Sequence, residues 1–386
     1  MPIQKKTSPK GPKTPRSGSA KKVRYAVVGL GYFAHEAILP AFANAKNNSD
    51  LTALFSDDPE KLRKLSRKYK VKSAYSYDQY SEALRSGEFD AVYIALPNDM
   101  HKEYAVRAAQ EGIHVLCEKP MAVSERDCEE MIRTANEHHV RLMIGYRLHF
   151  AAANLKAIDA IKSGKIGEPR FFNSAFSMQV KEDNIRVQAD HGGGSVYDIG
   201  IYCINAARSL FQDEPFEVIA RSDGKKDDPR FEQVDEMTSV ILRFPGDRQA
   251  TFTCSFGASD MSWYSVSGTK GDICLDNAYD YAMPSTLETT VGGRTQSKEF
   301  KKTDQVAPEI LYFSDCVLQG KEPEPSGLEG LADVRIIRAV YESALSGIPV
   351  KIARVEKRMR PSMEMEMNRP QAEQPDLFHA ESPTQD

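Results

Sequence analysis

A glycine-rich turn near the start of the chain limits the fold more than any other feature. The apolar run Val23 to Val28 leads directly into Gly-Leu-Gly-Tyr-Phe-Ala at residues 29–34, and residues 36–45 continue with apolar residues at helical spacing. Strand, glycine turn and helix in this order are typical of a dinucleotide-binding turn, where small residues let the backbone approach a pyrophosphate at the helix N-terminus. We therefore expect contacts to a dinucleotide from Gly29, Leu30, Gly31, Tyr32 and Phe33.

Length and composition fit a two-domain globular protein. The chain has 386 residues, and its formal net charge of -4 gives no general attraction for nucleic acid or an anionic membrane. No apolar run approaches the roughly 18 residues that span a bilayer. The six cysteines stand singly, which favours free thiols in a reducing compartment over disulfides or a zinc site. We expect a cytoplasmic protein without nucleic-acid, membrane or metal partners.

Sequence patterns divide the chain into two domains and two tails. Residues 1–22 are basic and rich in Pro, Ser and Gly, which predicts a disordered tail. Over residues 23–146, strand and helix patterns alternate, which predicts an α/β domain with a doubly wound parallel sheet. Over residues 147–352, successive strand patterns joined by Gly- or Pro-containing turns predict an α+β domain with a mostly antiparallel sheet. The polar residues 353–386 predict a flexible tail.

The end of the second predicted strand bears on which dinucleotide is bound. Residues 51–55 are followed by Ser56, Asp57 and Asp58, with Lys61 one helical turn later. A carboxylate here binds the adenosine ribose of NAD, whereas hydroxyl and cationic groups hold the 2'-phosphate of NADP. Ser56 and Lys61 favour NADP. Asp57 keeps NAD open as the alternative, and Lys61 could also be a solvated helix residue.

Two further turns follow apolar strands, so they lie at the carboxyl edge of the sheet, where open α/β folds bind ligands. The first turn predicts cofactor contacts from Leu96, Pro97, Asn98 and His101, with a structural role as the alternative for the histidine. The second is Glu118-Lys119-Pro120, where Lys119 could hydrogen-bond a substrate hydroxyl. Close to a cofactor cation the pKa of that lysine would be lowered. A surface turn lysine is the alternative.

A glycine run and a helix form the third candidate constellation. Glycines at residues 192–194 allow close approach of the backbone to a ligand or another segment. Asp198 and Tyr202 follow, four residues apart on one helix face. A tyrosine near a lysine is a workable acid/base pair for carbinol oxidation, because the lysine charge lowers a phenol pKa. Taken alone, a packing aromatic and a helix-terminal aspartate would be the simpler interpretation.

Several motifs together resemble one family of oxidoreductases over residues 22–352. They are Gly29-Leu30-Gly31, Glu118-Lys119-Pro120-Met121-Ala122, Gly145-Tyr146-Arg147 and Gly192-Gly193-Gly194-Ser195 with Asp198-Ile199-Gly200 and Tyr202. The family comprises glucose–fructose oxidoreductase, inositol dehydrogenase and rhizopine-catabolism oxidoreductases (Gfo/Idh/MocA), and the chain is most similar to the first branch. The resemblance implies a Rossmann domain, a second domain with a large open antiparallel sheet, and homodimers or homotetramers packed through that sheet.

The resemblance also implies chemistry and roles. Lys119 and Tyr202 would be the catalytic pair, with Asp198 assisting the substrate. Glu118, Lys119 and Arg147 would complete the cofactor contacts, and the substrate would meet Lys119, Arg147, His149, Asp198 and Tyr202. The motifs and the resemblance together predict an NADP-dependent sugar oxidoreductase. It would transfer hydride between C1 of an aldose such as glucose, xylose or arabinose and the nicotinamide, giving an aldonolactone.

Three alternatives stay open from the sequence. The protein could be a dehydrogenase for inositol, a dihydrodiol or another polyol. It could couple aldose oxidation to ketose reduction, as in a glucose–fructose-type paired reaction. It could also be a non-catalytic dinucleotide-binding sensor, because fold alone does not imply activity.

Overall fold

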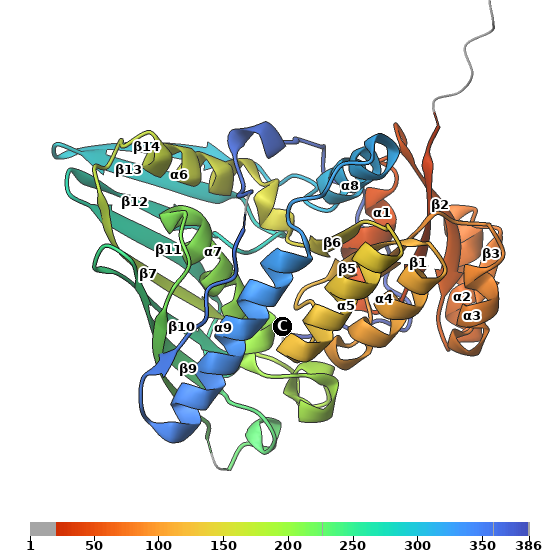
Figure 1. The fold of residues 1–386 in the computed structure, drawn as a ribbon, viewed down its shortest axis with the longest axis horizontal. Coiled ribbons are helices and arrows are strands. Elements are labelled where there is room, and N and C mark those ends of the chain that lie inside the picture. Colours follow the sequence, from red (N-terminus) through yellow and green to blue (C-terminus); the bar gives the residue numbers. More distant parts are fainter. Residues whose placement is uncertain (1–20, 226, 358, 385–386) are drawn as a thin grey trace, which may run out of the picture.

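The computed structural model describes residues 21–225, 227–357 and 359–384. Over this part of the chain, two β-sheets lie at opposite ends of the molecule, each accompanied by helices (Figure 1). Residues 1–20, most of the predicted disordered tail, lie outside the described residues. None of the helices that the structure describes has the length and apolar character needed to cross a membrane.

The first sheet is parallel and has six strands within the described ranges, in the order β3-β2-β1-β4-β5-β6. Its strands are β1 (Val23–Val28), β2 (Ser49–Phe55), β3 (Ser73–Tyr75), β4 (Ala91–Ile94), β5 (His114–Glu118) and β6 (Leu142–Gly145). The intervening helices are α1 (Leu39–Ala41, continuing a π-helical turn at Ala34–Ile38), α2 (Pro59–Tyr69), α3 (Tyr80–Leu84), α4 (His101–Gln110) and α5 (Glu125–Glu137). The predicted doubly wound sheet is confirmed. The strand order reverses between β1 and β4, where such sheets bind ligands.

Local chemistry explains how the chain enters and leaves the elements beside this point. Gly29 has φ 98°, and a Cβ there would lie 2.4 Å from the carbonyl oxygen of Ala95, so only glycine fits the turn after β1. Helix α2 begins at Pro59 because the Asp58 side chain accepts the backbone N–H of Lys61 at 2.9 Å. A proline in the first turn costs no helical hydrogen bond.

The second sheet is mixed and mostly antiparallel, with nine strands among the described residues in the order β14-β13-β12-β11-β7-β10-β9-β8-β15. Its strands are β7 (Pro169–Ser177), β8 (Glu217–Asp223), β9 (Met237–Phe244), β10 (Arg248–Ser255), β11 (Met261–Gly268), β12 (Gly271–Asp276), β13 (Ser285–Val291), β14 (Arg294–Phe300) and β15 (Val350–Lys351). Strands β7 and β10 pair in parallel, and the other neighbours are antiparallel. The predicted α+β domain with an antiparallel sheet is confirmed.

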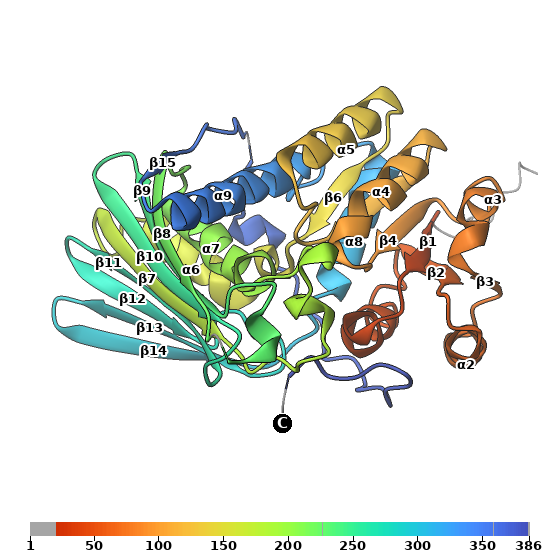
Figure 2. The same cartoon turned by 90° about the horizontal axis from the view of Figure 1, so that it is seen from below.

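One face of the second sheet is covered by helices and the other is open. Helices α6 (Ala152–Lys162), α7 (Ile201–Phe211) and α9 (Gly327–Ser346) lie on the same side of the sheet (Figure 2). Strand β9 shows the consequence, because its residues alternate between buried and exposed along its whole length. Side chains such as Ile241, 39% exposed, therefore face away from the helices.

Two late helices pack on the first domain, and α9 also contacts the second. Helix α8 (Ala307–Gln319) packs on β1 and β2, where the Tyr25 hydroxyl lies 2.7 Å from Ser314 Oγ. Helix α9 packs on α5 and β6 of the first domain and on β8 of the second. The chain thus returns to the first domain after β14, and β15 joins the edge of the second sheet only after α9.

Residues 353–357 and 359–384 run back over both domains in largely irregular form. The buried Lys357 ammonium pairs with Glu324 at 3.1 Å, and Met365 is buried in a short 3₁₀ turn. These contacts do not measure motion, so the flexibility predicted for residues 353–386 stays a prediction.

Candidate functional site

The glycine turn leaves its backbone open at the position where a pyrophosphate would lie. A Cβ added at Gly31 would meet no atom within 4 Å, in contrast to the tightly packed Gly29. Tyr32 and Phe33 are both half-buried, and the Phe33 ring packs edge-on against Tyr281 from the second domain, with 5.8 Å between ring centres. A dinucleotide therefore fits the turn, because the atoms that would block its approach are missing at Gly31.

The residues expected at the adenosine end lie beside this turn. The Lys61 ammonium donates to the carbonyl oxygen of Leu30 at 3.1 Å. Ser56 is buried, and its hydroxyl accepts the backbone N–H of Asp58 at 3.2 Å. Burial lowers the pKa of Lys61, which the neighbouring carboxylates of Asp58 and Asp57 oppose. A hydroxyl and a cation thus meet the glycine turn where a ribose phosphate would be held.

His101 connects two of the predicted cofactor turns. Its ring nitrogens lie 2.9 Å from the carbonyl oxygens of Leu96 and Pro120, one on each turn. The ring is fully buried, and burial lowers its pKa. Both nitrogens are engaged by backbone, as the structural alternative expects. A direct cofactor contact by His101 stays a prediction.

Asn98 contacts the second domain, whereas Glu118 forms its hydrogen bond within the first domain. Asn98, beside Pro97, donates to the carbonyl oxygen of Gly192 at 2.9 Å and so links the cofactor turn to the glycine run of the second domain. The Glu118 carboxyl accepts the Tyr93 hydroxyl at 2.8 Å inside the first domain, and burial raises its pKa. Whether Glu118 contacts the cofactor stays a prediction.

The three predicted catalytic residues come together. Lys119 follows β5, and its ammonium donates to the backbone carbonyl of Asp198 at 2.7 Å and to the carboxylate of the same residue at 3.1 Å. The Lys119 nitrogen also lies 4.8 Å from the centre of the Tyr202 ring. Asp198 belongs to a π-helical turn at Val196–Gly200 that leads into α7, which carries Tyr202. The lysine is therefore at the phenol face, held there by the aspartate.

A second cation, Arg186, completes this group. Its Nε donates to the free carboxylate oxygen of Asp198 at 2.7 Å. Burial would raise the pKa of Asp198, but Arg186 and Lys119 outweigh it and hold the pKa well below its usual range. Burial would lower the pKa of Lys119, but Asp198 and Tyr202 outweigh it and raise the pKa. The lowering of this pKa that a nearby cofactor cation would cause stays a prediction.

Arg147 also contacts Tyr202. The buried guanidinium donates to the Tyr202 hydroxyl at 3.3 Å and is 5.1 Å from its ring centre. It also donates to the Tyr279 carbonyl and the Gln305 side chain, and it lies over Tyr281. Tyr202 therefore has two cations close to it. The sequence predicted Arg147 for ligand binding, and the structure adds its contact with the phenol.

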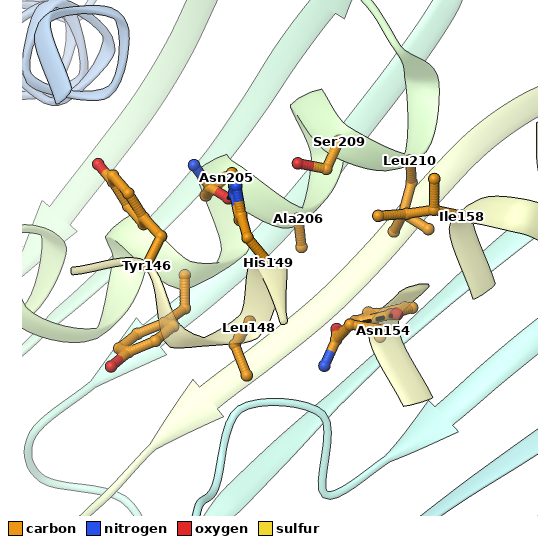
Figure 3. A pocket seen from close by; sticks show the side chains of 11 residues that line it. Tyr146, Leu148, His149, Asn154, Ile158, Asn205, Ala206, Ser209 and Leu210 are labelled. Atoms are coloured by element: carbon orange, nitrogen blue, oxygen red, sulfur yellow. Dashed lines mark hydrogen bonds between the residues drawn. The ribbon is translucent and has the colours of Figure 1, made fainter. Parts of the chain in front are cut away.

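His149 lines a small cavity (Figure 3). The cavity has a volume of about 20 Å³, close to that of one water molecule, and its lining includes Tyr146, Asn205 and Tyr202. The His149 Nε2 lies 2.8 Å from Asn205 Oδ1, and its ring stacks on Tyr146. Burial and the nearby Lys357 lower the pKa of His149 to about 3. The cavity is too small for a sugar, and substrate contact by His149 stays a prediction.

Arg186, Tyr279, Tyr281 and Gln305 were not found by sequence reasoning. No spacing pattern connects them to the predicted motifs, because they lie on loops whose path depends on the second sheet. Among the described residues, no group of three or more His, Cys, Asp or Glu side chains is arranged to hold a metal ion.

Comparison with known proteins places this geometry in a family. Residues 23–146 match GFO_IDH_MocA, an oxidoreductase family with an NAD-binding Rossmann fold, and residues 154–274 match the GFO/IDH/MocA C-terminal domain. The D-xylose 1-dehydrogenase (NADP+) of Haloarcula marismortui is 34% identical over 338 residues, covering 86% of this chain and 93% of that protein.

Two similar crystal structures support the same relationship. Aldose–aldose oxidoreductase from Caulobacter crescentus, complexed with glycerol, has a TM-score of 0.83 and 36% identity, covering 86% of this chain and 100% of that one. A 3-ketoreductase from Actinomadura kijaniata, in complex with NADP and TDP-benzene, has a TM-score of 0.76 and 25% identity, covering 84% and 98%. The family predicted from the motifs is confirmed: this chain is an NAD(P)-dependent oxidoreductase of the Gfo/Idh/MocA family.

Proposed function

We propose that this protein is an NADP-dependent sugar dehydrogenase that oxidises C1 of a cyclic aldose to an aldonolactone. The observation that carries the proposal is the meeting of Lys119, Asp198 and Tyr202 beside the dinucleotide turn, with Arg147 on the phenol hydroxyl. The similar proteins named as a D-xylose 1-dehydrogenase and an aldose–aldose oxidoreductase support an aldose as the substrate.

Each residue has a distinct task in this reaction. A bound nicotinamide cofactor would supply the acceptor for the hydride that leaves C1. The Tyr202 oxygen, in its deprotonated form, takes up the proton of the C1 hydroxyl and becomes the neutral phenol. Lys119 and Arg147 supply positive charge beside that oxygen and offset the charge that moves during proton transfer. Asp198 holds the Lys119 ammonium, and Arg186 holds Asp198.

The choice of NADP rests on the adenosine end. Ser56 directly follows β2, at a position where a carboxylate would favour NAD, and the Lys61 ammonium lies beside the glycine turn. Asp57 is exposed next to them and is the group that NAD would use. Dissociation constants for NADP and NAD, measured by fluorescence titration, test this choice. We expect tighter binding of NADP, and equal affinities would contradict the phosphate site.

Replacing the phenol tests the reaction itself. In Tyr202→Phe we expect kcat for aldose oxidation to fall by about 100-fold or more, because the proton acceptor is lost while the ring remains. Tyr279→Phe is the matched control, since its hydroxyl bonds Ser174 rather than Arg147 and its ring lies 6.0 Å from that of Tyr202.

The assay measures NADPH formation with glucose, xylose and arabinose, and with inositol and a dihydrodiol as the alternative substrates. Turnover by Tyr202→Phe at the wild-type rate would contradict the proposal that Tyr202 accepts the proton of the C1 hydroxyl. If the enzyme prefers inositol or the dihydrodiol, its substrate is that compound rather than an aldose, bound at the same site.

We also propose that copies of the chain pair through the open face of the second sheet. Apolar side chains such as Phe171, Ile219 and Met261 are 41–48% exposed on its strands. The cytoplasmic location predicted from the cysteines belongs to this proposal too, and cell fractionation tests it.

A further inference from the structure

The C-terminal segment 371–384 crosses the first domain on the side of the glycine turn (Figure 2). It begins just after Pro370, whose carbonyl oxygen accepts Asn44 Nδ2 at 2.7 Å. Four residues later, Gln374 donates to the Glu36 carboxylate at 3.3 Å, on the helical turn that follows the glycines. The segment therefore follows the element that would bind the pyrophosphate.

Its next contacts lie at the adenosine end. His379 Nδ1 is 2.7 Å from Asp58 Oδ2, and the His379 ring stacks on Phe378 with 3.9 Å between ring centres. The Lys64 ammonium lies 3.7 Å from the centre of the Phe378 ring. These two aromatic rings are thus fastened to the first turns of α2 by a hydrogen bond and a cation–π contact.

Asp58 connects this docking point to the proposed cofactor site. Its other carboxylate oxygen accepts the backbone N–H of Lys61, and the Lys61 ammonium reaches the Leu30 carbonyl in the glycine turn. The backbone N–H of Asp58 donates to Ser56. Asp58 therefore contacts His379 and also both residues that we propose for the 2'-phosphate, Ser56 and Lys61.

The end of the segment is hydrogen-bonded to the second domain. The backbone N–H of Lys181 donates to the carbonyl oxygen of Pro383 at 2.9 Å, and Val180 forms a β-bridge with Thr384. This loop continues to Arg186, which holds the catalytic aspartate. One short segment thus joins the adenosine end of the first domain to the loop that supports the catalytic group.

We propose that residues 371–384 are a strap that retains the bound dinucleotide. The inference rests on the proposed cofactor site, because it assigns the adenosine to the region around Ser56, Asp58 and Lys61. A cofactor held there leaves when the strap detaches from Asp58 and Val180, so the strap slows release. Neither family match, at residues 23–146 and 154–274, includes this segment.

The release rate of the cofactor tests the strap. The full chain is compared with a chain that ends at Pro370 and so keeps the contacts of Lys357, Met365 and Pro370. Each is loaded with NADPH, and dissociation is followed by stopped-flow fluorescence after excess NADP is added. We expect release from the shortened chain to be at least about tenfold faster. Equal rates in the two chains would overturn the strap.

A second variant decides the question if the shortened chain does not fold. The double variant Phe378→Ala with His379→Ala removes the docking rings and should release NADPH at least about fivefold faster. Leu377→Ala is the control, since this neighbouring side chain is 40% exposed. Release from the double variant at the rate of Leu377→Ala would overturn the strap as well.

The measurement uses no sugar, so it separates the strap from the proposed function. Fast release from the shortened chain supports the strap even if no aldose is oxidised. In that case only the proposed aldose substrate would be contradicted. If the full chain holds NADH rather than NADPH, the same comparison is made with NADH, and the NADP preference fails instead. A full chain that holds neither dinucleotide overturns both proposals.

Discussion

His149 shows how surroundings set the charge of a single side chain. Its Nε2 lies beside Asn205 Oδ1, its Nδ1 has no hydrogen-bond partner among the described residues, and Lys357 and Arg208 are close enough to disfavour a further positive charge. The ring is 2% exposed, so water cannot solvate the charged form of the imidazole. Burial is the larger cause and the two cations add to it, which together lower the pKa to about 3.

This lowered pKa predicts acid sensitivity. Above pH 6.5, His149 is neutral in both the folded and the unfolded chain and costs no stability. As pH falls below 6.5, the unfolded chain binds a proton that the folded chain refuses until about pH 3, so stability is lost. The loss from this residue reaches about 2 kcal/mol near pH 5. Chemical denaturation between pH 7 and 5 should show a shallower decline for His149→Gln, whose amide can still donate to Asn205.

The matched control for this prediction is His138→Gln. His138 is exposed at the end of α5, so its replacement should leave the decline of the wild-type chain unchanged. Parallel curves for wild type and His149→Gln would contradict the assignment of a buried neutral histidine.

The proximity of Lys119, Asp198 and Tyr202 was predictable from sequence, while the contact of Arg186 with Asp198 was not. Lys119 directly follows an apolar strand, and Asp198 and Tyr202 share a helix face, so local patterns bring all three toward one edge of a sheet. Arg186 lies in a 3₁₀ turn between β7 and the glycine run. Its contact with Asp198 depends on how that loop folds back, which no short-range pattern encodes.

Among the elements, the glycine turn contains two positions with opposite structural demands. Gly29 has φ 98° and no room for a Cβ, whereas a Cβ at Gly31 would meet open space. Gly29→Ala should therefore lower the free energy of unfolding by about 1–3 kcal/mol. Gly31→Ala should leave stability within about 0.5 kcal/mol and weaken dinucleotide binding by about tenfold or more, because the added methyl faces the ligand.

Thermal unfolding and fluorescence titration of both variants check this pair. The two effects must separate, with the loss of stability in Gly29→Ala and the loss of affinity without unfolding in Gly31→Ala. A Gly31→Ala variant that binds as tightly as wild type would place the pyrophosphate elsewhere.

Elements far from the site were harder to predict. No strand pattern in the sequence indicated β12, β13, β14 or the two-residue β15. Strand β14 has six exposed residues out of seven, so it lacks the apolar alternation that identifies a strand. Its pairing with β13 comes from a two-residue Gly292-Gly293 turn, where both residues have positive φ, as tight hairpins require. The hairpin is specified by its turn rather than by burial.

At the scale of the whole molecule, the open sheet face is the feature that a single copy leaves unexplained. Ile219 and Ile241 are direct cross-strand neighbours and are 41% and 39% exposed, with Met237 on the same strand as Ile241. The opposite face is covered by α6, α7 and α9, so these side chains have no helix to pack against. Apolar side chains that gather on one surface favour association.

We expect the wild-type chain to form dimers, or tetramers built from them, through this face. In a twofold interface each substitution occurs on both copies, so Ile241→Glu would bury two carboxylates without partners. It should weaken dimerisation by about 100-fold or more while leaving the folded monomer intact, because residue 241 faces away from the core of its own domain. Sedimentation velocity over a range of concentrations measures the association.

Leu345→Glu provides the comparison that makes this test specific. Leu345 is 92% exposed near the end of α9, away from the sheet face, so a glutamate there adds the same charge to the surface without entering the proposed interface. The Leu345→Glu chain should therefore sediment as wild type does. If Ile241→Glu also keeps the wild-type association state, the sheet face is not the interface. If both variants dissociate, added negative charge rather than the position on the sheet is responsible.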